Sequence, residues 1–273
     1  MASTLSASDG TELVVEEDGV GPPVVFVHGS SGGLDSWADI AQRLTGYRTV
    51  RYARRNHPPS DTGTRPNSFA VEAADLRCVL GLVAATCGQR AHVVGGSYGA
   101  TVALHAAIDG DERIASLALF EPPVLLSGPH LLPILDRYRR LCADARYGDA
   151  LELFAREVAC IPAEVVATAS FEPESEELGR TTTLSAGADL EAMADDTQGV
   201  DRWAAITVPV LLMQGGLSWP PLPEGMDRLA RVLPHAERVT WSDQSHFATA
   251  MVPQRVADTI RRFLAALEAK PGH

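Results

Sequence analysis

Residues 91–107 read AHVVGGSYGATVALHAA, and Gly95-Gly96-Ser97-Tyr98-Gly99 within them fits the pattern G-x-S-x-G. An apolar run precedes this pentapeptide and a helical run follows it. A serine on a sharp strand-to-helix turn has a strained backbone, and only small residues two positions away on each side avoid a clash. The stretch therefore predicts a reactive Ser97 hydroxyl at the carboxyl edge of a sheet, with Gly95 and Gly99 permitting the turn. The alternative is an ordinary glycine-rich turn between a strand and a helix.

Short β-rich runs alternate with helical runs along the chain. A helix usually returns the chain between parallel strands, so this alternation predicts an α/β fold with a mostly parallel sheet flanked by helices. Residues 24–27 and 117–120 are continuously apolar, as strands covered on both faces should be. Apolar residues at helical spacing from Val256 to Leu267 predict a final helix packed on the sheet. We expect strands at residues 12–16, 23–27, 49–53, 91–95, 114–120, 208–214 and 238–241.

A second glycine-rich turn, His28-Gly29-Ser30-Ser31-Gly32-Gly33, follows the apolar strand that ends at Val27. With the serine turn, it makes nearly the whole chain resemble the α/β-hydrolase family, whose sheet has eight strands. The resemblance implies that the His-Gly turn lies beside Ser97 and that the backbone N–H groups of Ser30 and Tyr98 form an oxyanion hole. Such a group of donors usually contributes most to the rate. His28 itself is expected to brace the loop rather than to carry a proton.

His246 lies in Asp243-Gln244-Ser245-His246-Phe247, between a strand-like run and the final helix. The family that the chain resembles has its catalytic histidine in this loop, so order and position both match. The resemblance implies that His246 takes the proton of Ser97 and later gives it to the leaving group. A solvated surface histidine, the alternative, fits the residue alone but not its position.

The third catalytic group departs from the commonest pattern of the family. Most relatives carry an acid just after the strand expected at 208–214, yet residues 215–223 contain neither Asp nor Glu. Some family members, among them relatives of haloalkane dehalogenases, place the acid one strand earlier, where this chain has Glu121. We therefore expect Glu121 to accept the Nδ1–H of His246, the alternative being a carboxylate that caps a turn or a helix. Weaker candidates for the same role are Asp195 and Asp196.

Residues 122–207 interrupt the alternation of strands and helices. The segment is helical and charged, with helical periodicity at 131–145 and 150–159. Structureless connections beyond ~15 residues are uncommon in compact domains. We therefore expect a helical cap over Ser97, inserted between the sixth and seventh strands. The hydrolase core is then made of residues 1–121 and 208–273.

The segment Arg54-Arg55-Asn56-His57-Pro58-Pro59-Ser60 is a second departure, because relatives usually carry a glycine-rich turn here that ends in serine. Its two prolines stiffen the loop. We expect His57 to be a surface histidine of this loop, with a side chain that faces the pocket as the alternative.

Charge and composition limit the classes of molecule that the protein is expected to bind. Nucleic-acid binding draws on clustered Lys and Arg that release counterions, and a formal net charge of −12 disfavours it. We expect a small, uncharged or weakly charged partner. No apolar run approaches the ~20 residues of a membrane span, and no export signal is evident at the N-terminus, so a cytoplasmic protein without membrane contact is expected. The four cysteines form no CxxC pair and have no His at ligand spacing, so neither a structural metal nor a disulfide framework is expected. Catalysis by Ser97 and His246 implies no cofactor.

Three functions are compatible with these residues. The first is hydrolysis of a small carboxylic ester, lactone or thioester through an acyl-enzyme on Ser97. The second uses the same Ser-His pair for carbon–carbon bond cleavage or cyclisation, since one fold supports several chemistries. The third is a ligand-binding protein with little turnover, which the lack of an acid at 215–223 favours and the retained Ser97 and His246 disfavour.

Overall fold

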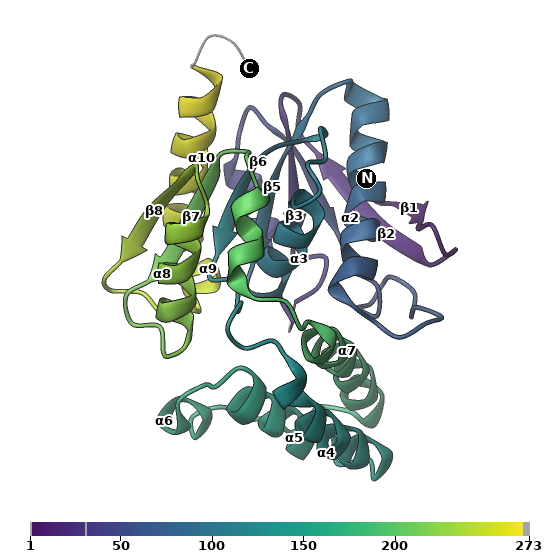
Figure 1. Cartoon of the computed structure of the whole chain (residues 1–273). Coiled ribbons are helices and arrows are strands. Elements are labelled where there is room, and N and C mark those ends of the chain that lie inside the picture. The colour runs from purple at the N-terminus through teal and green to yellow at the C-terminus, as the bar shows by residue number, and fades with distance from the viewer. Residues whose placement is uncertain (1, 31, 270–273) are drawn as a thin grey trace.

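One sheet organises the computed structural model of the chain, which describes residues 2–30 and 32–269. Within these residues its eight strands are β1 (Ala2–Ser6), β2 (Glu12–Asp18), β3 (Pro23–Val27), β4 (Arg48–Tyr52), β5 (Ala91–Gly96), β6 (Ile114–Phe120), β7 (Val210–Gly215) and β8 (Ala236–Trp241). They are ordered β1-β2-β4-β3-β5-β6-β7-β8 across the sheet (Figure 1). β2 is antiparallel to both of its neighbours, and all other pairs are parallel. The mostly parallel sheet predicted from the sequence is confirmed.

Helices cover both faces of this sheet (Figure 1). One face packs against α2 (Phe69–Cys87), α3 (Tyr98–Ala107) and α8 (Leu222–Val232), and the other against α1 (Ala38–Arg43) and α10 (Pro253–Glu268). The helices thus form two layers with the sheet between them.

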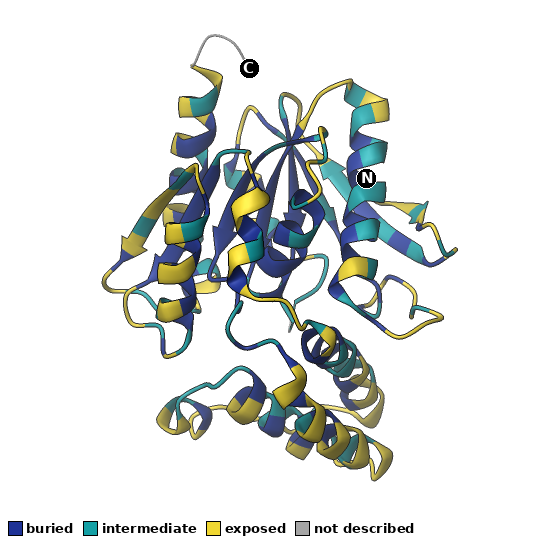
Figure 2. Ribbon diagram, viewed as in Figure 1, coloured by how far each residue is buried: buried dark blue, intermediate teal, exposed yellow. Residues whose placement is uncertain are grey.

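Alternation along each strand explains why both layers are needed. In β3, Val25 and Val27 belong to the core shared with α2 and α3, whereas Val24 and Phe26 belong to the core shared with α1 and α10. Successive side chains of a strand point to opposite faces, so a continuously apolar strand must be covered twice. Figure 2 shows the result, with buried residues gathered on the central strands and exposed ones on the outer sides of the helices.

All regular secondary structure of the chain between β6 and β7 is helical, and α4 to α7 gather at one end of the sheet (Figure 1). It contains η1 (Pro129–Leu131), α4 (Leu132–Ala143), α5 (Tyr147–Leu153), η2 (Phe154–Val158), α6 (Ala163–Val166), α7 (Glu176–Asp195) and η3 (Val200–Ala205). The hydroxyl of Ser175 caps α7 by accepting the N–H of Leu178, and Glu176 and Glu177 stand in its positive first turn.

Two local features differ from the sequence prediction. β1 was not expected, because its five residues are mostly exposed and polar and carry no alternating pattern. It is held by antiparallel pairing with β2. The helix expected over 150–159 changes at Phe154 into one π-helical turn, η2, and such turns often occur at functional sites. Among the described residues, no helix combines the length and apolarity that crossing a membrane requires.

Candidate active site

The turn between β5 and α3 holds Ser97 in a rarely populated backbone conformation. Its φ and ψ are 51° and −123°, and such a geometry stores strain in a residue other than glycine. A Cβ atom on Gly95 would lie 2.6 Å from the Cα of Ala100. A Cβ atom on Gly99 would lie 2.4 Å from the carbonyl oxygen of Val27. The turn therefore needs both glycines, and it presents the Ser97 hydroxyl at the carboxyl end of β5.

The imidazole of His246 connects Ser97 with Glu121. Its Nε2 lies 3.0 Å from the Oγ of Ser97, and its Nδ1 lies 2.6 Å from the Oε2 of Glu121. A carboxylate only accepts hydrogen bonds, so Nδ1 is the donor of this contact, and Nε2 is the ring nitrogen that faces the serine hydroxyl. The structure thus brings the three side chains into the order carboxylate, imidazole, hydroxyl. Such an arrangement can remove the hydroxyl proton as the oxygen attacks a carbonyl carbon.

Glu121 reaches His246 from the strand next to β7. It follows β6 directly, with a φ of 42°, and its side chain is fully buried. Its Oε1 accepts the N–H of Gly215 at a distance of 2.8 Å. Because β6 and β7 are parallel neighbours, one carboxylate can occupy the turn after β7 that carries no acid of its own.

The other acids considered from the sequence are placed differently. Asp195 is exposed at the end of α7. Asp196 accepts two hydrogen bonds from Arg202, both 2.6 Å long, and its Oδ2 lies 3.6 Å from the Nε2 of His105. Of the three acids, Glu121 is therefore the one that meets His246.

The residues expected to form the oxyanion hole lie next to Ser97. Tyr98 is the first residue of α3, so its N–H is free of the hydrogen-bond ladder of the helix. Ser30 lines the same cavity as Ser97. The turn that precedes Ser30 packs tightly on the serine, since a Cβ atom on Gly29 would lie 3.3 Å from the Cβ of Ser97.

His28 braces this turn. Its Nε2 accepts the backbone N–H of Arg54 at 3.0 Å, and its Nδ1 donates to the carbonyl oxygen of Gly29 at 2.9 Å. Since Nε2 accepts an N–H, the ring is neutral. Burial lowers the pKa of His28 well below its ordinary value, which agrees with this neutral form. The ring proton on Nδ1 is hydrogen-bonded to the Gly29 carbonyl, and these two contacts tie the His28 side chain to the loop.

A cavity of about 410 Å³ opens beside the Ser97 hydroxyl. It lies between the sheet and the helices that separate β6 from β7, and no Arg, Lys, Asp or Glu occurs among the described residues that line it. Its apolar lining comes from both parts of the chain. The helical segment contributes Leu126, Phe154, Val158, Ile161 and Met193, and the rest contributes Trp37, Phe120, Trp219, Leu222 and Phe247.

The prediction that His57 is a surface histidine is wrong. Its exposed fraction is 2%, and the adjacent Arg54 and Arg55 are each 1% exposed. The guanidinium of Arg54 pairs with Glu72 of α2 and Asp189 of α7. Arg55 pairs instead with Asp75 of α2 and with Asp9. Each arginine therefore has carboxylate partners of its own, as a buried charge requires.

One signal in the sequence could have indicated this cluster. Glu72 lies about one helical turn from both Phe69 and Leu76, which are buried in the core. The apolar spacing of α2 therefore places a carboxylate on the buried face of the helix, and such a group calls for a buried cation. No comparable signal connects Asp189 with Arg54.

Comparison with known proteins assigns the chain to a family. A family model of the α/β hydrolase fold matches residues 22–249, so the chain belongs to the α/β-hydrolase family. It is 30% identical over 234 residues to a non-heme haloperoxidase of Rhodococcus erythropolis, covering 77% of this chain and 80% of that protein. It is 28% identical over 137 residues to a 2-hydroxy-6-oxo-6-phenylhexa-2,4-dienoate hydrolase of Comamonas testosteroni, covering 48% of this chain and 47% of that protein.

A solved structure is similar over almost the full length. It is an α/β hydrolase of Sphaerobacter thermophilus that is 31% identical in sequence and superposes with a TM-score of 0.78. The match covers 96% of this chain and 100% of the other. Among the described residues, no group of three or more His, Cys, Asp or Glu side chains is arranged to hold a metal ion.

Proposed function

We propose that the protein hydrolyses small carboxylic esters, lactones or thioesters through an acyl-enzyme on Ser97. The observation that carries this proposal is the continuous line from the buried Glu121 carboxylate through His246 to the Ser97 hydroxyl, with contacts of 2.6 and 3.0 Å. The Glu121 carboxylate is buried, and the Ser97 hydroxyl faces a cavity in which a substrate can bind. Membership of the α/β-hydrolase family supports it further.

The first half of the reaction forms an ester on the enzyme. His246 Nε2 takes the Ser97 proton as Oγ attacks the carbonyl carbon, and the imidazolium that results is stabilised by Glu121. The oxyanion accepts hydrogen bonds from the N–H groups of Ser30 and Tyr98. The imidazolium then gives its proton to the leaving group. In the second half, water attacks the acyl group with the same assistance and releases the acid.

The cavity indicates the class of substrate. Its described lining is largely apolar and contains no Arg, Lys, Asp or Glu. The one charge expected there is the positive charge that His246 gains when it takes the proton of Ser97. A charged substrate would lose its hydration there without gaining an ionic partner, which is costly. We therefore propose an uncharged, apolar acyl group. The same lining disfavours the carbon–carbon alternative in the form that the Comamonas relative's name describes, because a dienoate carries a negative charge.

We also propose a division of the chain into two parts. Residues 1–121 and 208–273 form the hydrolase core, and residues 122–207 form a helical cap. The proposal is supported by the side chains that this segment contributes to the cavity beside Ser97, Met193 of α7 among them. The cap would then select the acyl group, while the core carries the chemistry.

A labelling experiment tests the proposed function. A fluorophosphonate probe should modify the wild-type protein at Ser97 and leave Ser97→Ala unlabelled. p-Nitrophenyl esters of graded acyl length should be turned over by the wild type alone. Binding of an ester without labelling or turnover would support the ligand-binding alternative instead and refute the proposal.

A further inference from the structure

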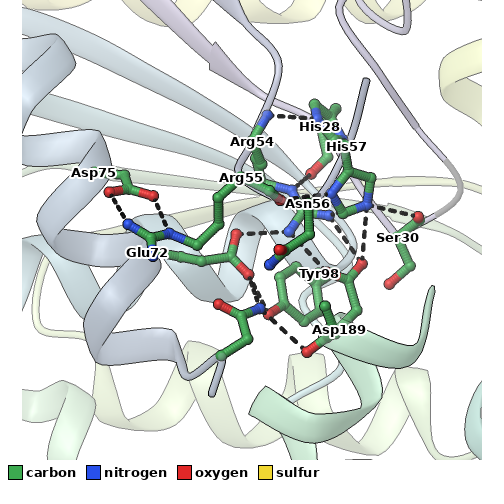
Figure 3. Close-up of polar contacts among 12 residues, drawn as sticks. His28, Ser30, Arg54, Arg55, Asn56, His57, Glu72, Asp75, Tyr98 and Asp189 are labelled. Carbon is green, nitrogen blue, oxygen red and sulfur yellow. Dashed lines mark hydrogen bonds and ion pairs between the residues drawn. The ribbon is translucent and has the colours of Figure 1, made fainter. Parts of the chain in front are cut away.

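Arg54 lies at the centre of a buried polar cluster beneath the turn that contains Gly29 and Ser30 (Figure 3). All three guanidinium nitrogens donate. Nε donates to the carbonyl oxygen of His28 at 3.0 Å, and one terminal nitrogen donates to the carbonyl oxygen of Gly29 at 3.2 Å. The Arg54 side chain therefore holds the two peptide carbonyls that come directly before Ser30. Because a peptide unit is planar, fixing the Gly29 carbonyl also fixes the Ser30 N–H of the same unit.

The same cluster also contacts Tyr98. The guanidinium carbon of Arg54 lies 4.4 Å from the centre of the Tyr98 ring. The phenol donates to Oε1 of Glu72 at 2.6 Å, and Oε2 of Glu72 accepts from Arg54 at 2.6 Å. One arginine thus supports both residues whose N–H groups are assigned to the oxyanion hole, yet it is absent from the described lining of the cavity.

A further partner of Arg54, besides the ring of His57 at 3.1 Å, comes from the helical segment. Asp189 of α7 is fully buried, and each of its carboxylate oxygens accepts one guanidinium N–H at 2.9 Å. Burial by itself would raise the pKa of Asp189, but Arg54 and His57 hold it below the ordinary value, so the aspartate is ionised. Figure 3 shows Asp189 approaching from α7 on the side opposite to His28. Two parallel bonds of this kind fix direction as well as distance.

We propose that Arg54 and Asp189 are positioning residues, through which docking of the helical segment sets the geometry of the oxyanion hole. This inference rests on the proposed function, in which Ser30 and Tyr98 stabilise the oxyanion. Weakening the pair should displace the Ser30 N–H and lower transition-state stabilisation, while leaving the Ser97–His246–Glu121 line and the apolar cavity in place.

The chain offers a matched control in the neighbouring pair of Arg55 and Asp75. Arg55 is as deeply buried as Arg54 and forms two parallel bonds with Asp75 of α2, 2.6 and 2.7 Å long. Its guanidinium contacts Asp9 instead of the turn before Ser30. Asp75→Asn therefore disturbs a buried ion pair of the same kind without a direct effect on the turn formed by His28, Gly29 and Ser30.

The test compares Asp189→Asn with Asp75→Asn on an ester that the wild type hydrolyses. A misplacement of about 1 Å remote from the chemistry can cost about 10²-fold. We expect Asp189→Asn to lower kcat and kcat/KM together by roughly 10- to 100-fold, which indicates loss of an interaction made only in the transition state. Asp75→Asn should keep kcat within about threefold of the wild type, although its melting temperature should fall about as far as that of Asp189→Asn. Equal kcat values for the two variants would overturn the proposal.

Amide hydrogen exchange supplies a readout that needs no turnover. Exchange in a peptide containing His28, Gly29 and Ser30 should accelerate in Asp189→Asn and not in Asp75→Asn. If the wild type were inert toward fluorophosphonate and esters, the proposed function would fail while this structural link could still hold. Unchanged exchange in an active protein would refute the link alone. Should Asp189→Asn not fold, Asp189→Glu keeps the charge but displaces the carboxylate from the guanidinium of Arg54. It should lower kcat and accelerate exchange at residues 28–30 in the same way, and the absence of both changes would overturn the proposal.

Discussion

Two clusters of the molecule each combine histidine with buried carboxylate, one carboxylate in the first and several in the second, yet they differ in which groups a ligand can reach. In the first, the imidazole of His246 joins Glu121 to a Ser97 hydroxyl that faces a cavity. In the second, Arg54 and His57 are enclosed by carboxylates and peptide carbonyls. The same kinds of group therefore prepare a reactive atom in one place and fix the backbone in the other. The clusters differ in access to a cavity and in the group that the histidine faces, which is a serine hydroxyl in the first and an arginine guanidinium in the second.

The largest effect should follow removal of the accessible hydroxyl. Ser97→Ala should lower turnover of an ester by ~10⁴- to 10⁶-fold, because the three catalytic groups act as a unit. Within the described residues the hydroxyl bonds only to His246, so urea unfolding should give a free energy within about 0.5 kcal/mol of the wild type. A variant that retains near-wild-type turnover would remove Ser97 as the nucleophile.

Glu121→Gln should come next. The acid fixes the tautomer of His246 and stabilises the imidazolium, and losing such help costs about 10⁴-fold in turnover. The Gln amide can still accept the N–H of Gly215, so circular dichroism should show a folded protein. Full activity of this variant would show that Glu121 does not assist His246. The first cluster would then work as a Ser-His dyad without an acid.

Asp189→Ala should affect stability more than any substitution in the first cluster. It leaves the buried Arg54 with one carboxylate fewer, and removing one partner of a buried ion pair costs about 3–5 kcal/mol. Urea unfolding at pH 7 measures this loss. If Asp189→Ala were as stable as Ser97→Ala, the second cluster would not be the structural one.

The smallest effect should come from the wall of the cavity. Met193→Phe narrows the space beside Ser97, so kcat/KM for the longest acyl group accepted should fall by about 10- to 200-fold relative to an acetyl ester. Leu184→Phe, at an exposed position of the same helix, is the control and should leave this ratio unchanged. Equal ratios in the two variants would place the acyl group outside this cavity.

Local patterns predicted much of the fold. The alternation of apolar strands with helices predicted the parallel sheet, since strands covered on both faces must be apolar throughout. The glycines around Ser97 indicated the turn. A Cβ atom at Gly95 or Gly99 would collide with backbone atoms of Ala100 or of Val27, so only glycine fits at these two positions. β1 carried no such pattern and exists through its pairing with β2.

The sequence by itself determined the class of fold, the serine turn and the order of Ser97 and His246, because each depends on spacing along the chain. It offered Glu121 as an acid, but only the parallel pairing of β6 with β7 decided that its carboxylate meets His246. Burial of Arg54 was likewise decided by tertiary structure. Its partner Asp189 lies 135 residues away along the chain, and a charge becomes tolerable in the interior only when folding brings its counter-charge to it.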